Sequence, residues 1–404
     1  MILDQYLNVA PKGDLLLLQR LGQRLKGKTF LHINSTRSGG GVAEILHRMI
    51  PILGELGIDV RWEVIGGDER FFDITKKIHN ALQGNREEFT NEMWEYHFEV
   101  NRINAATLNL DADAVFIHDP QPMPLIAFKK TGRWLWRCHI DVANPLPEAW
   151  EHLKGYCEKF DAAIFSVSKF SKPLSIDEFI IAPSIDPLSD KNRDLSSDEI
   201  SETAAKLGIP RDKPIILQVS RFDRFKDPVG VIRAYRSVKK YNDCILVLAG
   251  SEATDDPEGA AVLNEVREHA AGDPDIHILL LPPFSDKDIN ALQRMATVIL
   301  QKSLREGFGL TVTESLWKGK PVIGGATGGI PLQITHGVTG FLVHSTEGAA
   351  FRIRQLLNNP EMARKMGETA REHVRINFLM TRQIRDYLAA WYSIENKGKS
   401  ILEL

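Results

Sequence analysis

Short apolar runs alternate along this chain with longer segments in which apolar residues recur at helical spacing. The pattern predicts strands in a first group at residues 29–34, 58–65, 114–118, 134–140, 162–167 and 179–181. A second group is predicted at 215–219, 244–249, 276–281, 298–300, 321–323 and 341–343. Helices are expected between the strands, among them 42–56, 86–108 and most of 360–392. This alternation is typical of parallel sheets whose faces are covered by helices.

A break in the rhythm separates the two groups of strands. Residues 183–187 include two prolines, and the stretch 189–202 is polar, as is usual at a domain boundary. The length of 404 residues suits two domains. We therefore predict an α/β protein with two Rossmann-like doubly wound domains facing across a cleft, at 1–185 and 186–375. A C-terminal helix within 376–404 is expected to pack back on the first domain. Ligands are expected at the carboxyl ends of the strands.

Composition excludes several classes of function. Hydrophobic residues make up 43% of the chain and charged residues 25%, as in globular proteins with an ample core. The net charge of −3 gives no basic footprint for nucleic acid or for an anionic membrane. Three widely spaced cysteines, Cys138, Cys157 and Cys244, match no zinc or disulfide framework. With no signal peptide and no apolar run of transmembrane length, a cytoplasmic location is expected.

The segment 303–319 carries the strongest candidate chemistry. It follows the strand at 298–300 and places Glu306, Gly307 and Gly309 on a turn that opens a helix. Glycines let backbone N–H groups approach a ligand closely, and a helix N-terminus attracts anions. A carboxylate beside such a site suits a ligand with both an anionic part and a polyol part, and Glu314 in the same helix could bind further hydroxyls. The alternative is a capped helix with two surface glutamates.

Two cations follow the strand at 215–219. Arg221 can bind a diphosphate as a planar fork and Lys226 as a point charge. The alternative is a solvated loop, and Arg224 between them is assigned to the surface.

Polar residues also follow the strands of the first domain. The glycine turn at Gly39, Gly40 and Gly41 could hold a phosphate or could be only a tight strand-to-helix turn. The carboxyl ends of the predicted strands at 114–118 and 134–140 carry His118, Asp119, Gln121, His139 and Asp141. We expect them to form a polar pocket for sugar hydroxyls. Metal binding is the lesser alternative, because no third ligand recurs at helical spacing.

These segments together resemble a known family. Residues 305–314, with two glutamates separated by seven residues, resemble the donor-site motif of retaining glycosyltransferases with two Rossmann domains (GT-B). Residues 220–226 resemble the diphosphate clamp of that family, and 321–330 and 340–343 resemble the elements that follow. In the first domain, 34–44, 117–122 and 134–141 resemble the trehalose glycosyltransferring synthases and the related trehalose phosphorylases. The resemblance covers nearly the whole chain.

The resemblance implies a reaction, substrates and roles for residues. A nucleotide-activated glucose, UDP- or ADP-glucose, would be joined to free glucose to give trehalose, with the leaving phosphate taking the acceptor's proton in a front-face attack. Catalytic roles are implied for Arg221, Lys226, Glu306, His139 and Asp119. The other residues implied at the donor are Gly40, Gly41, Leu281, Gly307, Phe308, Gly309, Leu310, Thr311 and Glu314, and those at the acceptor are Asn34, Arg37, His118, Gln121 and Asp141.

Several points stay open at this stage. Arg37 could bind the phosphate of glucose 6-phosphate, which would make the enzyme a trehalose-6-phosphate synthase. Inorganic phosphate in the leaving-group site would make it a trehalose phosphorylase. A sensor that binds nucleotide sugar without turnover is a third alternative. The residues require no cofactor and predict no metal ligand set, but leave Mg²⁺ open as a counter-ion of the diphosphate and leave a homodimer open. The nucleobase is expected near Leu281.

Overall fold

The computed structural model describes residues 2–37, 40–251 and 257–402. The chain divides into two compact units, one made of Met1–Ser184 with Met380–Leu404 and the other of Ile185–Leu379. The sequence pattern placed these divisions after residues 185 and 375. The chain passes from one unit to the other at two places, and the segments there are bonded to each other. The amide of Ile185 donates to the carbonyl of Phe378 at 2.9 Å, and Ile185 forms an isolated bridge with Leu379.

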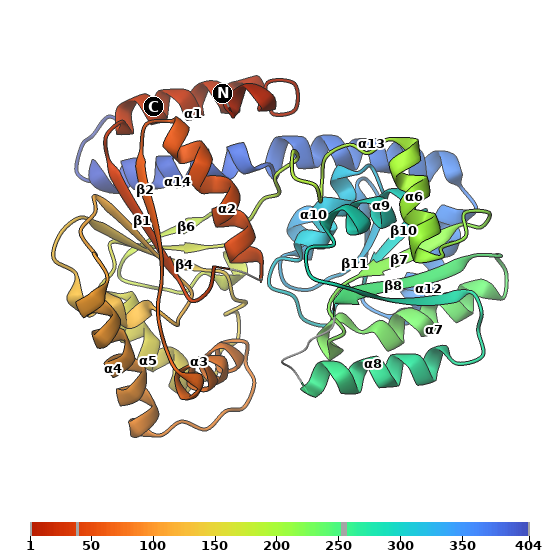
Figure 1. Ribbon diagram of the computed structural model, residues 1–404, viewed down its shortest axis with the longest axis horizontal. Coiled ribbons are helices and arrows are strands. Elements are labelled where there is room, and N and C mark those ends of the chain that lie inside the picture. The colour runs from red at the N-terminus through yellow and green to blue at the C-terminus, as the bar shows by residue number, and fades with distance from the viewer. Residues whose placement is uncertain (1, 38–39, 252–256, 403–404) are drawn as a thin grey trace. The chain divides into compact units, whose positions relative to one another are not determined.

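Unit 1 contains a six-stranded parallel sheet in the order β2-β1-β3-β4-β5-β6. Helices α1, α2 and α14 pack together as one layer, and α3, α4 and α5 as another (Figure 1). The strands are β1 Thr29–Asn34, β2 Asp59–Val64, β3 Ala114–His118, β4 Arg133–Cys138, β5 Ala162–Phe165 and β6 Asp177–Ile180. The α-helices are α1 Lys12–Leu25, α2 Gly40–Glu55, α3 Glu69–Leu82, α4 Asn91–Thr107, α5 Pro147–Cys157 and α14 Met380–Glu395, and 3-10 helices cover Leu3–Tyr6, Met123–Phe128 and Ser168–Phe170.

Unit 2 contains a second six-stranded parallel sheet in the order β12-β11-β10-β7-β8-β9. Helices α7, α8 and α12 pack as one layer, and α6 packs against α9 in the other (Figure 1). The strands are β7 Ile215–Val219, β8 Ile245–Ser251, β9 Ile276–Leu281, β10 Val298–Gln301, β11 Val322–Gly325 and β12 Gly340–Val343. The helices are α6 Ser197–Leu207, α7 Pro228–Lys239, α8 Pro257–Ala270, α9 Asp286–Met295, α10 Leu310–Trp317, α11 Ile330–Gln333, α12 Thr346–Leu357 and α13 Pro360–Asn377, with a 3-10 turn at Arg224–Lys226.

The predicted fold class, two doubly wound α/β domains, is confirmed. Central strands such as β3, β7 and β10 are buried along their whole length, because helices cover both faces of each sheet. The predicted strand at 134–140 ends earlier, at Cys138, because a side chain rather than a neighbouring strand binds the amide of His139. The predicted helix at 86–108 begins at Asn91, where Thr90 caps it by accepting from the amide of Met93.

Helix α3 lies between two predicted strands, but the pattern did not predict its range. Its start is set by Asp68, whose carboxylate accepts from the amide of Phe71 at 2.9 Å, an N-cap geometry that stabilises the first turn of a helix.

Helix α14 completes the core of unit 1. Trp391 packs on Phe30 with ring centroids 5.2 Å apart, and Tyr387 packs on Phe116 at 5.6 Å. Both partners lie on central strands, so the C-terminal segment covers the middle of the first sheet beside α1 (Figure 1).

Each sheet has one point where the strand order reverses direction. In unit 1 the point lies between β1 and β3, and in unit 2 between β7 and β10. Adjacent connections leave in opposite directions there and open a crevice at the carboxyl ends of the strands, where open α/β sheets bind ligands. Asn34 and His118 end the strands at the first point, and residues 220–227 and 302–309 follow those at the second.

A close approach of two backbones holds α10 in place. Helix α10 packs against α13, and a Cβ atom added at Gly367 of α13 would lie 1.9 Å from the carbonyl oxygen of Gly319. No side chain fits in that gap, so Gly367 lets α13 hold the helix that carries Glu314.

We predict that Gly367→Ala destabilises the protein by about 1–3 kcal/mol, since an added methyl group forces backbone to move in a packed region. Gly348→Ala, in the same unit, is the matched control. Its Cβ would meet neighbours only at 3.5 Å or more, and its effect is expected to stay within about 0.5 kcal/mol. Urea unfolding followed by circular dichroism measures both. Equal stabilities for the two variants would contradict the packing argument.

Candidate functional site

A lysine and a glutamate meet at the switch point of unit 2. Lys226, after β7, places its Nζ 2.6 Å from Oε2 of Glu306, after β10, and the hydroxyl of Ser303 donates to the same oxygen at 3.1 Å. Their side chains are 17% and 9% exposed, so the pair is largely removed from water. The structure thus brings together two residues, 80 positions apart, that the sequence pattern assigned separately to a diphosphate and to sugar hydroxyls.

Further contacts tie the same two loops together. The buried ammonium of Lys302 pairs with the carboxylate of Asp227, and the amide of Leu304 donates to the carbonyl of Phe225 at 2.7 Å. Asp227 has a left-handed backbone with φ of 51° and caps α7 by accepting from the amide of Gly230 at 3.1 Å. These bonds fix the loop on each side of Lys226.

Glycines shape the turn that carries Glu306. Gly309 has φ of 82°, directly before α10, and the Glu306 side chain lies over it, within 3.1–3.4 Å of where a Cβ would stand. Gly328 also has a positive φ, and a Cβ there would lie 1.6 Å from the carbonyl oxygen of Glu306. Only glycine fits at Gly328, so the segment after β11 presses directly on the turn at 306–308.

Glu314 lies deeper along α10. It is buried, and its Oε2 accepts from Nε2 of Gln293 at 3.3 Å. Lys318, one turn further on, donates to the carbonyl of Glu314 at 3.2 Å and to Oδ1 of Asn192 at 3.0 Å. Burial lowers the pKa of Lys318 to about 7, against the opposing attraction of Glu314. Glu314 is therefore held in a buried polar cluster and is no surface carboxylate.

The other donor-side candidates differ in their settings. Arg221 is 67% exposed, and its side chain lies 3.5 Å from that of Asp223. Leu281 ends β9, which is separated from β7 by β8. Gly41 lies in the first turn of α2, which begins at Gly40, and Gly39 lies outside the described residues. The remaining candidates, Gly307, Phe308, Leu310 and Thr311, lie on the turn and the first turn of α10.

Histidines form the centre of the switch point in unit 1. Nδ1 of His118 lies 3.0 Å from Nε2 of His139, and Nε2 of His118 lies 3.1 Å from Nδ1 of His32 on β1. Burial is the main cause that holds the pKa of His118 and His139 well below the usual range, and the cation Arg137 adds to the effect. The three rings are thus neutral groups that can donate and accept hydrogen bonds.

Asp119 adopts an uncommon backbone conformation beside these rings. Its φ is 63°, and its Oδ1 accepts from the amide of His139 at 2.7 Å. Burial raises the pKa of Asp119 to about 7, although the His139 amide and Arg137 act in the opposite direction. A left-handed aspartate at a strand end costs free energy, and such strain is common at functional sites.

The remaining acceptor-side candidates are held by nearby groups. The Asn34 amide accepts from Nε1 of Trp62 at 2.8 Å and donates to the carbonyl of Thr36 at 2.7 Å. Arg37 donates to the carbonyl of Trp62 at 2.5 Å and lies over its ring. Oδ1 of Asp141 accepts from the amide of Ala143 at 2.9 Å.

Gln121 differs from these candidates. Its side-chain oxygen is buried without a hydrogen-bond partner in the described chain, while its carbonyl accepts from His97 at 3.0 Å.

Sequence reasoning missed His32, Asp227 and Lys302. Asp227 could have been found, because an aspartate before a proline at a helix start is a capping signal. Lys302 could also have been found, because it follows a predicted apolar strand, as the cations after residue 219 do. His32 lies inside a strand and gave no signal of its own.

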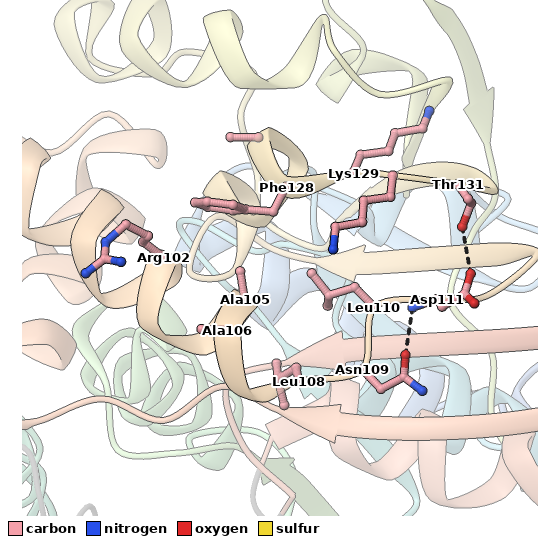
Figure 2. Close-up of a pocket in the computed structure, with 12 residues that line it drawn as sticks. Arg102, Ala105, Ala106, Leu108, Asn109, Leu110, Asp111, Phe128, Lys129 and Thr131 are labelled. Carbon is pink, nitrogen blue, oxygen red and sulfur yellow. Dashed lines mark hydrogen bonds between the residues drawn. The ribbon is translucent and has the colours of Figure 1, made fainter.

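A separate pocket of about 820 Å³ lies in unit 1, away from these residues. Residues 108–111 and 127–131 line it before the amino ends of β3 and β4, together with Arg102 of α4 (Figure 2). The hydroxyl of Thr131 donates there to Asp111 at 2.7 Å. His118 ends β3 and His139 follows β4, both at the opposite ends of these strands, so the pocket is not the predicted site.

The described residues contain neither a cluster of metal ligands nor a membrane-spanning helix. Within 2–37, 40–251 and 257–402, no three histidine, cysteine or acidic side chains are grouped to hold a metal ion. In the same ranges, no helix has the length and apolar character needed to span a membrane.

The two doubly wound units have the fold of the GT-B class. A solved α,α-trehalose 6-phosphate synthase from Burkholderia multivorans matches 92% of this chain and 100% of its own with a TM-score of 0.74, and its 15% identity concerns the fold alone. A family model described as "Glycosyl transferases group 1" matches residues 199–373, and one described as "Trehalose synthase, N-terminal domain" matches 32–172.

Sequence comparison narrows the class to one family. A trehalose synthase from Pyrococcus horikoshii is 45% identical over 394 residues, which span 96% of this chain and 95% of that protein. The chain belongs to the trehalose synthase family. A trehalose phosphorylase from Pleurotus pulmonarius is 29% identical over 461 residues, covering 98% of this chain and 62% of that protein.

We predict that Asp119→Asn stabilises the protein increasingly as pH rises. The raised pKa means that the folded parent holds a proton that the unfolded chain, with a value near 3.8, has lost. The parent's stability therefore falls between about pH 4 and pH 7 and then levels off. Asparagine stays neutral, tolerates a positive φ and keeps an oxygen for the His139 amide.

Urea unfolding across this pH range gives the stability difference between variant and parent. Asp59→Asn, at an exposed position of β2, controls for the loss of one negative charge. A difference for Asp119→Asn that does not grow with pH would contradict the assignment.

Proposed function

We propose that the protein is a retaining hexosyltransferase that joins nucleoside-diphosphate glucose and free D-glucose to give α,α-trehalose and the nucleoside diphosphate. The observation that carries this proposal is the pair of Lys226 and Glu306 at the switch point of unit 2. A donor of this kind has a diphosphate, which needs a cation, directly joined to a sugar, whose hydroxyls need an acceptor. One side chain of each kind stands at hydrogen-bond distance from the other.

The chemistry requires charge stabilisation more than covalent participation. The bond between the anomeric carbon and the diphosphate oxygen breaks, and its electrons stay with the diphosphate. A hydroxyl of the acceptor forms the new bond on the same face of the sugar, and its proton passes to the departing diphosphate. Lys226 and the exposed Arg221 stabilise the developing charge, while Glu306 orients the donor sugar and Glu314 binds the ribose.

The acceptor side of the proposal rests on what unit 1 offers. Arg37 is engaged by the carbonyl and the ring of Trp62, and Arg137 is buried in β4. The groups near the switch point are neutral imidazoles and the Asp119 carboxyl group. Hydroxyl partners without a dedicated cation suit free glucose better than glucose 6-phosphate.

Phosphorolysis is the second candidate function. A cation site that holds the terminal phosphate of a leaving group also fits inorganic phosphate, and a relative at 29% identity is described as a trehalose phosphorylase. Isomerisation of maltose, another reaction that gives trehalose, needs no diphosphate site, so the contacts around Lys226 disfavour it.

We expect trehalose from UDP- or ADP-glucose with free glucose, identified by chromatography and by NMR of the anomeric protons. Parallel reactions contain glucose 6-phosphate as acceptor, trehalose with phosphate, or maltose alone. Product only from glucose 6-phosphate would make Arg37 the decisive residue. Glucose 1-phosphate released from trehalose only with phosphate would identify a phosphorylase, and conversion of maltose an isomerase. Addition of EDTA tests the Mg²⁺ counter-ion.

Arg221→Ala is expected to lower kcat/KM for the nucleotide sugar roughly 100-fold, because one stabiliser of leaving-group charge is lost. Arg224→Ala is the matched control, since Arg224 lies in the same loop and pairs with Glu265 at 3.3 Å. Its activity should stay within about threefold of the parent. Steady-state kinetics on variants with parental circular dichroism decide the point. Equal effects at the two positions would remove Arg221 from the mechanism.

A further inference from the structure

Three histidines in unit 1 form a continuous hydrogen-bonded chain from the candidate site into the sheet. His139 follows β4, His118 ends β3 and His32 lies within β1. The contacts are 3.0 Å from Nε2 of His139 to Nδ1 of His118, and 3.1 Å from Nε2 of His118 to Nδ1 of His32. The planes of successive rings are inclined by only 17° and 28°, and the ring centroids lie 5.3 and 5.4 Å apart, as expected for rings that are hydrogen-bonded edge to edge.

Each ring in this chain carries a single proton near neutral pH. Burial lowers the pKa of His32 to about 3 and is also the main cause of the lowered pKa of His118 and His139. A neutral imidazole has one N–H donor and one bare nitrogen acceptor. The two hydrogen bonds must therefore run in the same direction along the chain, because His118 can donate to only one neighbour.

Two directions are then available. If His139 donates from Nε2, then His118 donates from Nε2 to His32, and His32 carries its proton on its own Nε2. If His32 donates from Nδ1, then His118 donates from Nδ1, and His139 accepts at Nε2. In the second case His139 carries its proton on Nδ1.

The inner end of the chain selects the second direction. At this end, Nε2 of His32 is buried and has no hydrogen-bond partner among the described residues of the protein, and the His32 ring stacks on Phe116 with centroids 4.7 Å apart. A buried N–H without a partner is rarer in proteins than a buried acceptor without one. His32 is therefore expected to keep its proton on Nδ1, where it is hydrogen-bonded, and to leave the bare nitrogen toward the apolar side.

The outer end is open to a ligand. Nδ1 of His139 has no hydrogen-bond partner among the described residues. It is also not one of the fully buried polar atoms that lack a partner. His139 itself is partly exposed.

We propose that His32 is a positioning residue that fixes the tautomer of His139 through His118, so that His139 presents Nδ1–H as a hydrogen-bond donor to a substrate oxygen. That the recipient is a substrate rests on the proposed function. The direction of the chain does not, because it follows from the protein's own contacts. An N–H donor at this position can bind a sugar hydroxyl oxygen or a phosphate oxygen. The same nitrogen cannot act as a base that removes a proton from the substrate.

The tautomers can be measured directly. Protein labelled with ¹⁵N in the histidine rings is studied by long-range ¹H–¹⁵N correlation, which distinguishes protonated from bare ring nitrogens. The His139 signals are assigned by their loss in His139→Gln. All three rings are expected to be protonated on Nδ1. Protonation of His139 on Nε2 would overturn the proposal, whether or not the protein makes trehalose.

Two substitutions of His32 test its action on His139. His32→Phe fills the space without a donor, whereas the amide nitrogen of His32→Asn can take the place of Nδ1. In His32→Phe we expect mixed tautomers at His139 and kcat reduced about tenfold or more, with KM for the nucleotide sugar within about twofold. His32→Asn should restore both the single tautomer and most of kcat.

The outcomes separate a positioning role from a structural one. Equal losses in the two variants, or a His139 tautomer that does not change in His32→Phe, would show that His32 only fills the core. If His32→Phe fails to fold, the spectrum of the parent and the activity of His32→Asn still decide. If no trehalose forms with any substrate, the function fails while the spectrum still decides the hydrogen-bond direction.

Discussion

A parallel sheet covered on both faces leaves polar side chains little room except at the ends of its strands. Both units obey this constraint, and in both the polar residues gather at the carboxyl ends, where the strand order reverses. Topology therefore determines where the crevices lie. The residues that line them can differ between the two units. Glycines at positions such as Gly328 let backbone reach these crevices where any side chain would collide.

The two crevices are organised by different physical means. In unit 2, opposite charges hold two loops together, since an ammonium or carboxylate taken out of water needs a close partner. In unit 1, hydrogen bonds among neutral rings and a partly buried carboxyl group hold the segments after the strands together. A charged ligand suits the first arrangement, because it can compete for paired charges. A neutral polyol suits the second, because it exchanges hydrogen bonds without any net charge entering.

Much of the fold could be predicted from the sequence because buried parallel strands are almost continuously apolar. The ranges 29–34, 114–118, 215–219 and 276–281 match the observed strands. The end of β4 could not be predicted, since the Asp119 carboxylate binds the amide that would have extended it. Such a contact depends on side chains that meet only in the folded chain.

The candidate site was predictable to a similar degree. Glu306 could be predicted because it follows a strand and has glycines beside it, and Lys226 because it follows a strand in a loop with other cations. Their direct contact could not be predicted from either segment. The pairing of Asp227 with Lys302 and the place of His32 in a chain of rings depend on which strands are neighbours. Strand order cannot be predicted from local pattern, so the sequence did not predict these three residues as part of the site.

The C-terminal helix has a consequence for how the protein is made. Unit 1 contains both Met1–Ser184 and Met380–Leu404, and α14 supplies Tyr387 and Trp391 to its core. A ribosome that has finished the first sheet must still synthesise roughly 200 residues of unit 2, which takes on the order of 10–40 s, before that helix emerges. During this interval Phe30 and Phe116 lack their final cover. The nascent first domain therefore cannot complete its core until α14 has been synthesised, whereas the second can close as soon as its own strands are complete.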